Sequence, residues 1–338
     1  MDKNVKKRVI FIFKLVVTVL LLFYLFHTKG VNLKKSVEIL ARSNYIYFFL
    51  SLFLLLFGQF ICSYRWKVIL KAMDIDISLF RLFQFYLIGM FFSLFLPSIV
   101  GGDFVKIFYV KEESGKPISY IIASIYLERA TGFFFLILYG IFGALMYKIN
   151  ITSKEIPLLS NFGIREIDIV YIPIFFLLLF VLVNIVVFTS GLYNIAIKML
   201  NRLNLKKFSE KISILHDATR IFRNKPSVLI VPLVISAINI FFVSVENYLI
   251  GIGIGIKASF YAYMIIISLM STVVMLPISI NGIGLRENIF VVLFSLIGVD
   301  PNSSFSLSLI SFLVVVLSAL PGGVVYSLLK TKPVPEEI

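Results

Sequence analysis

The chain has 338 residues, 59% of them hydrophobic, and its mean hydropathy is +1.00. This composition excludes an ordinary soluble enzyme and leaves no room for a large soluble domain, so residues 1–338 are expected to form one integral membrane domain. The formal net charge of +14 arises from 32 Lys and Arg against 18 Asp and Glu. On a membrane protein, this excess indicates cytoplasmic anchoring and contact with anionic phospholipid at the cytoplasmic face, rather than with nucleic acid.

The residue inventory gives no sign of a metal centre or a nucleotide site. One cysteine, Cys62, and two histidines allow neither an intramolecular disulfide nor a Cys/His zinc pattern. The sequence contains no Walker A pattern and no Ser nucleophile elbow, which indicates that ATP does not drive the chain directly. We therefore expect no metal and no cofactor.

The first part of the chain predicts two membrane spans with a short helix between them. Basic residues precede an apolar run over 9–26 that is long enough to cross a bilayer. Residues 31–43 place apolar side chains at intervals of three and four, the pattern of an amphipathic helix at the membrane interface. A second span covers about 45–63 and is followed by residues expected to anchor it at the interface: Arg65, Trp66 and Lys67.

The next apolar run, 82–96, is too short to cross a bilayer comfortably, and it leads into Leu96-Pro-Ser-Ile-Val-Gly-Gly-Asp-Phe-Val-Lys106. Proline and glycine break a helix here, at a depth where hydrocarbon tolerates no unsatisfied backbone group. We therefore predict that about 82–117 is a broken segment that lines a polar cavity.

The middle of the chain contains a long apolar helix over 118–147, with Glu128 and Arg129 well inside it. A polar loop (148–168) and a span at about 169–189 follow. Residues 191–225 carry eight Lys or Arg against two acidic residues, so the positive-inside tendency places this loop in the cytoplasm.

The last third predicts a span at about 227–250, an apolar run at 258–276 and a final span at about 305–329. After the apolar run comes Val274-Met-Leu-Pro-Ile-Ser-Ile-Asn-Gly-Ile-Gly-Leu-Arg-Glu-Asn288, which holds a helix breaker, two glycines and two opposite charges. About 258–298 is therefore the second predicted broken segment.

The two broken segments match each other. In both, the apolar run ends in Leu-Pro, and a basic residue falls nine places after the proline, Lys106 after Pro97 and Arg286 after Pro277. Interrupted hydrophobic segments at corresponding places in two halves are typical of a transporter's binding site. Counting crossings from a cytoplasmic N-terminus predicts an all-α polytopic membrane protein with about six full transmembrane helices and two re-entrant segments in an inverted repeat. Both termini are then cytoplasmic, and only the basic loop 28–43 lies on the unexpected side.

Each broken segment is expected to bind an anion. A helix that restarts after the glycines presents unpaired N–H groups and the positive end of its dipole. Glycine lets a ligand approach the backbone, and Lys and Arg add full charges that suit a phosphate. The alternative is that proline and glycine only kink ordinary spanning helices. The candidate substrate-binding residues are Gly101, Gly102, Asp103, Lys106, Glu128, Arg129, Asn281, Gly282, Gly284, Arg286 and Glu287.

The charges inside the spans are expected to pair. A charge about ten residues into a spanning helix, such as Glu128, costs at least ~2.5–3.5 kcal/mol and should face the protein interior with a partner. We expect Glu128 to pair with Lys106 or Arg286, which leaves Arg129 for substrate. A purely structural ion-pair network is the alternative.

Other acidic residues leave alternatives open. Asp103 either caps the helix after its glycines or joins the site. Glu287 either neutralises a neighbouring cation or couples a proton. Glu246 is buried by the span assignment and is a weaker candidate, while Asp74 and Asp76 have the spacing of a metal–nucleotide-sugar pair but are typical of a polar loop.

Five stretches carry a family resemblance: Arg65-Trp66, Leu96–Asp103 with Lys106, Leu127–Arg129, Pro277–Glu287 and Leu320–Gly323. Together they resemble the flippase-like membrane proteins related to the membrane half of lysylphosphatidylglycerol synthases, over nearly the whole chain. The resemblance implies translocation of a lipid with a phosphate-bearing head group between leaflets. We expect no soluble aminoacyl-transferring domain of the kind found in full-length synthases, so lysine transfer is not carried over.

The sequence thus predicts a lipid translocase of a bacterial-type inner membrane, not an enzyme, which moves a phospholipid or a polyprenyl-phosphate-linked lipid. The alternative is a membrane glycosyltransferase or other group transferase acting on a polyprenyl phosphate, with Asp74 and Asp76 as the visible donor-side residues. A third hypothesis is a subunit that positions a partner through loop 191–225. The lipid, the direction, the energy source and a homo-oligomeric state stay open.

Overall fold

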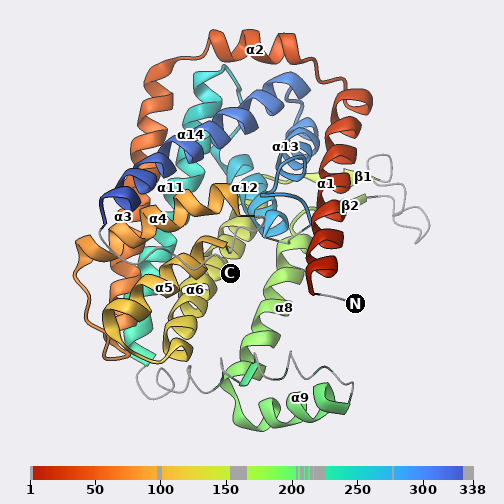
Figure 1. The fold of residues 1–338 in the computed structure, drawn as a ribbon. Coiled ribbons are helices and arrows are strands. Elements are labelled where there is room, and N and C mark those ends of the chain that lie inside the picture. Colours follow the sequence, from red (N-terminus) through yellow and green to blue (C-terminus); the bar gives the residue numbers. More distant parts are fainter. Residues whose placement is uncertain are drawn as a thin grey trace.

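The computed structural model describes residues 3–96, 101–152, 166–202, 226–275 and 278–329, together with 205, 209, 212, 213 and 216. The described chain is almost entirely helical (Figure 1). Its α-helices are α1 (Lys3–Thr28), α2 (Leu33–Ala41), α3 (Tyr45–Lys71), α4 (Leu79–Phe95), α5 (Gly101–Ser114), α6 (Ile118–Met146), α8 (Tyr171–Phe188), α9 (Ser190–Arg202), α11 (Ile230–Gly253), α12 (Phe260–Val274), α13 (Leu285–Ser295) and α14 (Pro301–Leu328). A 3₁₀ helix, η1 (Pro226–Leu229), precedes α11.

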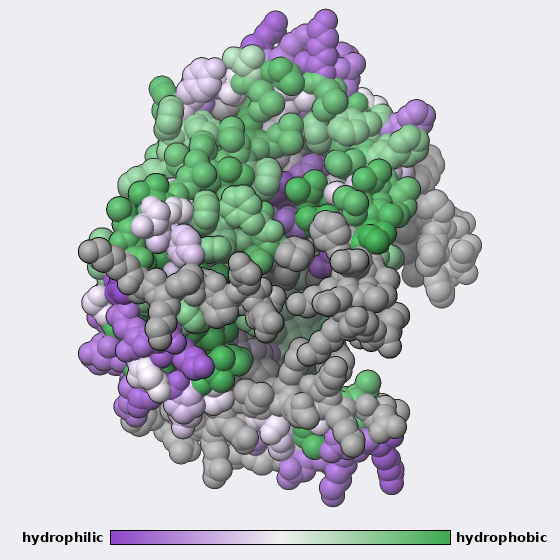
Figure 2. Space-filling view, viewed as in Figure 1, coloured by the Kyte–Doolittle hydropathy of each residue, from purple (hydrophilic) through white to green (hydrophobic). Residues whose placement is uncertain are grey.

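Five of the described helices are long and apolar enough to cross a membrane: Tyr45–Lys71, Ile118–Met146, Tyr171–Phe188, Ser227–Gly253 and Pro301–Leu328. A sixth is counted when Ile12–Thr28 is taken with Leu33–Ala41, from which it is bent by 88°. Large hydrophobic side chains are exposed along these helices, so the surface is apolar where a bilayer would surround it (Figure 2). The chain is an all-α polytopic membrane protein, as its composition predicts.

Side chains that precede the helices determine where several of them begin. Asn32, Ser78 and Asp300 each stand before a helix and accept a hydrogen bond from a backbone N–H group in its first turn. Pro301 follows the last of these caps at the first turn of α14, where a missing N–H group costs nothing.

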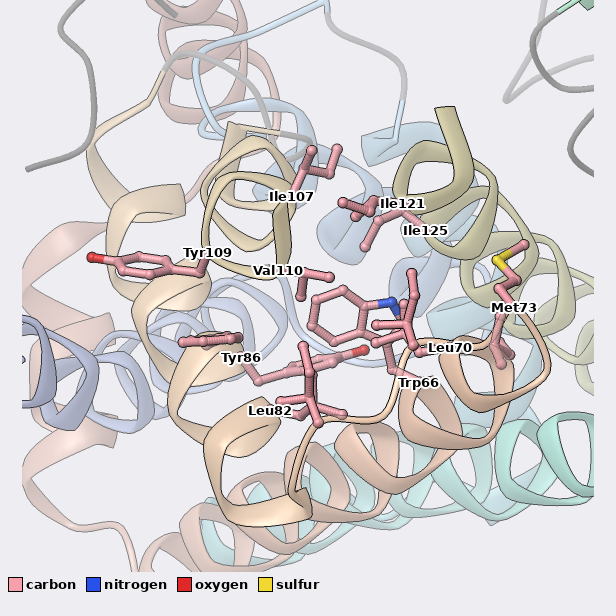
Figure 3. Close-up of a cluster of buried hydrophobic side chains, with 14 of the residues drawn as sticks. Trp66, Leu70, Met73, Leu82, Tyr86, Ile107, Tyr109, Val110, Ile121 and Ile125 are labelled. Carbon is pink, nitrogen blue, oxygen red and sulfur yellow. The ribbon is translucent and has the colours of Figure 1, made fainter. Parts of the chain in front are cut away.

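Helices far apart in sequence build the bundle: α3 packs along α11, α6 along α12 and α14 along α4. The largest apolar cluster lies where α3, α4, α5 and α6 meet, around the fully buried Trp66 (Figure 3). Trp66 Nε1 donates a 3.0 Å hydrogen bond to Ser124 Oγ on α6, which satisfies the polar end of the indole. This cluster fixes the relative positions of the four helices.

The second span is longer than predicted, because α3 continues from the expected end near residue 63 to Lys71. The prediction that Arg65 and Trp66 are interface anchors is wrong, since both side chains are buried among neighbouring helices, whereas Lys67 is half-buried. A charge in the sequence was taken as the end of the span. In the folded bundle, partners on α6 satisfy both polar groups and the helix continues.

The first predicted interruption is a break between two antiparallel helices. Arg81, near the start of α4, forms a 2.8 Å ion pair with Glu113, near the end of α5. Closer to the turn, Gly89 of α4 lies against Gly102 of α5. The prolines that were predicted to cause both interruptions lie outside the described residues, in 97–100 and 276–277.

α12 and α13 form the second hairpin. Tyr263, near the start of α12, packs on Phe294, near the end of α13, with ring centroids 5.0 Å apart. The connection contains Asn281, Gly282 and Gly284, all with positive φ, a conformation that glycine adopts freely and asparagine tolerates. In Figure 1 the two hairpins approach the middle of the molecule from different sides.

The amphipathic segment predicted at 31–43 is confirmed as a helix, α2. Leu33 and Val37 are exposed, whereas Ser36 is buried against α14 and its carbonyl accepts a 3.2 Å hydrogen bond from Ser306 Oγ. The helix therefore lies across the end of the bundle with an apolar edge turned outward.

Two predicted loops contain some regular structure. The polar loop 148–168 holds two short antiparallel strands, β1 (Asn150–Thr152) and β2 (Glu166–Asp168). The basic loop 191–225 begins with most of α9, and the greater part of it after α9 lies outside the described residues.

Candidate functional site

A cavity of about 370 Å³ lies inside the bundle, between the turns of the two hairpins. Its polar lining side chains come from both halves of the chain: Gln59, Arg65, Ser93, Asp103, Lys106, Glu128, Arg129, Asn239, Asn281 and Arg286. Apolar side chains of α14 close one side: Phe312, Val315 and Ala319. Figure 2 shows hydrophilic side chains within the apolar belt, over the region where α12, α13 and α14 lie in Figure 1.

Glu128 on α6 holds two cations from two other helices. Its Oε1 accepts a 3.0 Å hydrogen bond from Arg65 Nη2 of α3, and its Oε2 accepts a 3.2 Å hydrogen bond from Lys106 Nζ of α5. All three side chains are buried, so each charge depends on the others for compensation. As predicted, Glu128 pairs with Lys106, while Arg286 is not its partner.

Lys106 is surrounded on several sides. Besides Glu128, its Nζ lies 3.1 Å from Asp103 Oδ1, one turn earlier on α5. It also lies 4.1 Å from the ring centre of Tyr86 and 5.0 Å from that of Trp66, close enough for cation–π attraction. The ammonium group is therefore fixed in the wall of the cavity.

Arg129 reaches Asp103 across the α5–α6 interface. Its Nη2 lies 2.8 Å from Asp103 Oδ2, and its Nε donates a 3.0 Å hydrogen bond to the same oxygen. Arg129 was expected to be left for substrate, and folding brings a carboxylate from a different helix beside it. The Arg129 side chain is still 43% exposed, against 4% for Asp103, so part of the guanidinium faces the open space.

Asp103 had two predicted roles, helix cap and member of the site. Its carboxylate binds Lys106 and Arg129, and its contacts are those of the charged network. The position near the start of α5 also suits a negative charge, because the helix dipole is positive there.

Arg286 and Glu287 form a second charged group on α13. Arg286 Nη2 lies 2.6 Å from Glu287 Oε1, and its guanidinium stacks 4.4 Å from the ring centre of Phe312 on α14. Glu287 Oε2 accepts a 2.6 Å hydrogen bond from the N–H group of Gly284, the residue before the helix. Glu287 therefore neutralises a neighbouring cation, which is one of its two predicted roles. It also caps α13.

The glycines of the turns serve helix packing. A Cβ added to Gly102 would overlap the Gly89 carbonyl, and one added to Gly284 would lie 3.0 Å from the carbonyl oxygen of Thr18 on α1. Gly101, Gly282, Gly284 and Glu287 do not line the cavity, unlike the other seven candidate residues. The start of α13 is covered by α1 and capped by Glu287, so the predicted anion site at that helix end is already occupied by protein groups.

Four of these polar lining residues were not among the candidates: Gln59, Arg65, Ser93 and Asn239. Gln59, Cys62 and Arg65 follow one another at intervals of three, the spacing of residues that share one face of a helix. This spacing could have predicted that the three side chains face the cavity together. It was overlooked because Arg65 was interpreted as an interface anchor.

The charges of the site do not cancel. Arg65, Lys106, Arg129 and Arg286 carry four positive charges, whereas Asp103, Glu128 and Glu287 carry three negative ones. These groups therefore leave a surplus of one positive charge around the cavity. Among the described residues, no group of three His, Cys, Asp or Glu side chains could hold a metal ion.

The fold and the cavity together define a polytopic membrane protein with a cationic cavity inside its helical bundle. The chain belongs to the family of lysylphosphatidylglycerol synthase transmembrane regions, whose family model matches residues 11–323. The match covers every element that lines the cavity.

The chain is also similar to UPF0104 membrane proteins of archaea. It is 20% identical over 309 residues to one from Methanocaldococcus jannaschii, covering 87% of each chain. It is 21% identical to one from Pyrococcus horikoshii (84% of this chain, 87% of the relative) and 23% identical to one from Methanothermobacter thermautotrophicus (82% and 83%). No solved structure gives a significant match.

Proposed function

We propose that the chain is a flippase-like translocase that moves a phosphate-bearing lipid between the leaflets of the cytoplasmic membrane. The observation that carries this proposal is the convergence of Lys106, Arg129 and Arg286, from the two halves of the chain, on one cavity inside an apolar bundle. A cationic cavity at membrane depth favours an anionic head group over water or hydrocarbon.

The helix lengths support a re-entrant arrangement of the two hairpins. At 1.5 Å per residue, α4 and α12, with 17 and 15 residues, span roughly 26 and 22 Å, less than the ~30 Å of a hydrocarbon core. α5 and α13 are shorter still, with 14 and 11 residues. In the proposed topology each hairpin enters and leaves on its own side, and the turns face each other across the cavity in an inverted repeat.

The phosphate is held by arginines that already have carboxylate partners. Arg129 and Arg286 each bind a carboxylate through one edge of the guanidinium, and a guanidinium has five N–H donors. A phosphate can therefore join both pairs, or take the place of Asp103, whose carboxylate keeps Lys106 as a partner, without leaving any buried charge unpaired. This exchange of partners gives binding that is specific but reversible, as transport requires.

The lipid tails have a way out along α14. Val315 lines the cavity and is 37% exposed, and Leu313 and Leu320 nearby on the same helix are exposed as well. The head group can occupy the cavity while the tails remain in the bilayer beside α14. A head group that carried its tails inside would need far more than about 370 Å³.

The test is leaflet exchange of labelled anionic phospholipid and of labelled polyprenyl phosphate in proteoliposomes. We expect Arg286→Ala to lower exchange by about tenfold or more, the effect of losing a charged contact of ~1.4 kcal/mol or more. Arg202→Ala, which removes an exposed arginine on α9, is the matched control and should retain the wild-type rate. Wild-type exchange no faster than that of empty liposomes for either lipid would refute the proposal.

The same assay separates translocation from the rival transferase hypothesis. Asp74 and Asp76 lie exposed between α3 and α4, outside the cavity. The double substitution Asp74→Asn/Asp76→Asn should leave exchange unchanged. Loss of exchange in this variant would favour a donor-dependent reaction.

A further inference from the structure

Glu246 is a buried acid that the proposed translocation does not use. It lies in α11, and the residue is only 4% exposed. Its backbone carbonyl accepts a 3.1 Å hydrogen bond from Ser51 Oγ of α3, but no hydrogen bond or ion pair joins its carboxyl group to any described residue. Every other buried acid of the described chain, namely Asp103, Glu128 and Glu287, has a basic partner.

The helices packed against α11 offer Glu246 no compensating charge. α12, α14 and η1 contain no Asp, Glu, Lys, Arg or His. On α3 the charge nearest to Ser51 is Arg65, fourteen residues away and hence about 21 Å along the helix. The two charged residues of α6 are already paired, Glu128 with Arg65 and Arg129 with Asp103.

The titratable groups on the elements around this part of α11 are tyrosines. Tyr47 of α3 lies against Gly253 near the end of α11, and the hydroxyl of Tyr263 of α12 lies against Gly251. Tyr248 is on α11 itself. Tyrosine hydroxyls are neutral at physiological pH, so an ionised Glu246 would be an isolated charge in an apolar setting. In this arrangement of the helices the neutral acid is therefore the favoured form of the carboxyl group.

The acid nevertheless lies close to the polar cavity. Asn239, which lines the cavity, precedes Glu246 by seven residues, so both lie on the same face of α11, about 10 Å apart along the helix. Gly58 of α3 packs against the Asn239 side chain, and Ser51, seven residues earlier, contacts Glu246. The same α3–α11 seam thus carries both residues.

A second line of polar groups connects the neighbour of Glu246 with the charged group of α13. Ser311 Oγ of α14 donates a 2.8 Å hydrogen bond to Asn247 Oδ1. One turn earlier on α14, Ser308 Oγ lies 3.5 Å from Glu287 Oε1, the oxygen that pairs with Arg286. Polar side chains therefore extend from the cavity to the surroundings of Glu246 within an otherwise apolar core.

We propose that Glu246 is a proton-binding site that couples lipid translocation to the proton gradient. This inference rests on the proposed translocase function and adds its energy source. One proton carried with one singly negative head group makes the transported pair neutral, so the membrane potential no longer opposes or drives the movement. The neutral acid beside a cationic cavity is the form expected for the proton-loaded state.

The step itself is a reversible proton transfer. The O–H bond of the Glu246 acid breaks, its electron pair stays on the carboxylate, and the proton passes to a water molecule that enters from the cavity. On the opposite side of the membrane the reverse step restores the acid. Ser311, Asn247 and Asn239 supply the hydroxyl and amide groups that would order such water.

The experiment compares lipid exchange with and without an imposed pH difference across proteoliposomes. With one proton per lipid, a difference of one pH unit supports a leaflet ratio of up to about tenfold for wild type. Glu246→Gln keeps the shape of the neutral acid, so exchange without a gradient should continue while the tenfold accumulation falls to an even distribution. Glu112→Gln, at an exposed position of α5, should retain both.

A second measurement reports the acid directly in the wild-type protein. Infrared spectra with isotope-labelled glutamate should show the carbonyl band of a protonated carboxylic acid, and this band should be missing from Glu246→Gln. Equal accumulation by wild type and Glu246→Gln, or the absence of the band, would overturn the proton site and leave translocation intact. Absence of any exchange by wild type would instead refute the proposed function, and the band would still decide the protonation of Glu246.

Discussion

Glu128 is the residue on which the charged cavity depends. It joins Arg65 of α3 and Lys106 of α5 to α6, with donor–acceptor distances of 3.0 and 3.2 Å, and all three groups are buried. A buried pair adds little net stability compared with an apolar core, but removing one partner leaves the other charge without compensation. Glu128 therefore compensates two cations at once, and among the described residues it is the carboxylate that pairs with Arg65.

We predict that Glu128→Gln destabilises the folded protein strongly. It keeps the shape of the side chain but leaves Arg65 without an anion, and breaking a buried pair in this way costs about 3–5 kcal/mol. Thermal unfolding in detergent, followed by the fluorescence of Trp66, would measure the loss. Glu38→Gln on exposed α2 serves as the control and should unfold like wild type. Equal unfolding temperatures for the two variants would contradict this role of Glu128.

The hairpins depend on close helix packing at glycines. Gly102 of α5 lies against the Gly89 carbonyl of α4, and Gly322 of α14 lies against the Leu87 carbonyl, also of α4. α4 is thus approached by backbone on two sides, which holds Lys106 and its neighbours at the cavity wall. Such contacts have no room for a side chain and cannot be relieved by a rotamer change, since the opposing atoms are backbone.

At this scale we predict that Gly102→Ala separates α4 from α5. Overpacking costs about 1–3 kcal/mol, with more expected against backbone, and the displaced Lys106 should lower lipid exchange as well. Gly191→Ala in α9 is the matched control, because a Cβ there meets nothing within 4 Å and alanine favours a helix. Wild-type stability and exchange in Gly102→Ala would show that the close packing at this glycine is not required.

At the scale of the whole molecule, exposed basic residues lie at both ends. α2 lies at one end of the bundle and α9 at the other, with the apolar belt between them (Figures 1 and 2). Both carry exposed lysines, so the positive-inside tendency by itself does not say which end is cytoplasmic. We propose that the larger basic surplus of 191–225 places the α9 end, together with both termini, in the cytoplasm.

The topology predicts opposite labelling of the two ends. In a Cys62→Ala background, a membrane-impermeant thiol reagent should label Lys34→Cys in intact cells and Lys198→Cys only after permeabilisation. Both positions are exposed, so access depends on the side of the membrane and not on burial. Labelling of both variants in intact cells, or the reverse order, would contradict the proposed orientation.

Much of the fold could be predicted from the sequence because the bilayer imposes simple rules on it. Long apolar runs and the breakers at the two interruptions locate most helices within a few residues of their observed bounds. The second span was predicted too short because a charge at Arg65 resembles a helix end until its partner on α6 is known.

The candidate site could be predicted only in part. Lys106, Glu128 and Arg286 line the cavity. Charged side chains inside apolar segments are costly in hydrocarbon unless they are paired, so the sequence alone marks these three residues as candidates. The pairing of Arg129 with Asp103, and the use of Gly284 for contact with α1, depend on which helices become neighbours. Sequence separation gives no information about those distances.

The sequence by itself determined the class of the protein, its two interruptions and the residues too polar to face lipid, because transfer into hydrocarbon is a property of each segment alone. Tertiary structure decided which charges compensate each other, which glycines meet helices instead of ligand, and that Arg65 belongs to the cavity. Those outcomes depend on distances of a few ångströms between helices far apart in the chain, and the short range of hydrogen bonds and ion pairs makes such distances decisive.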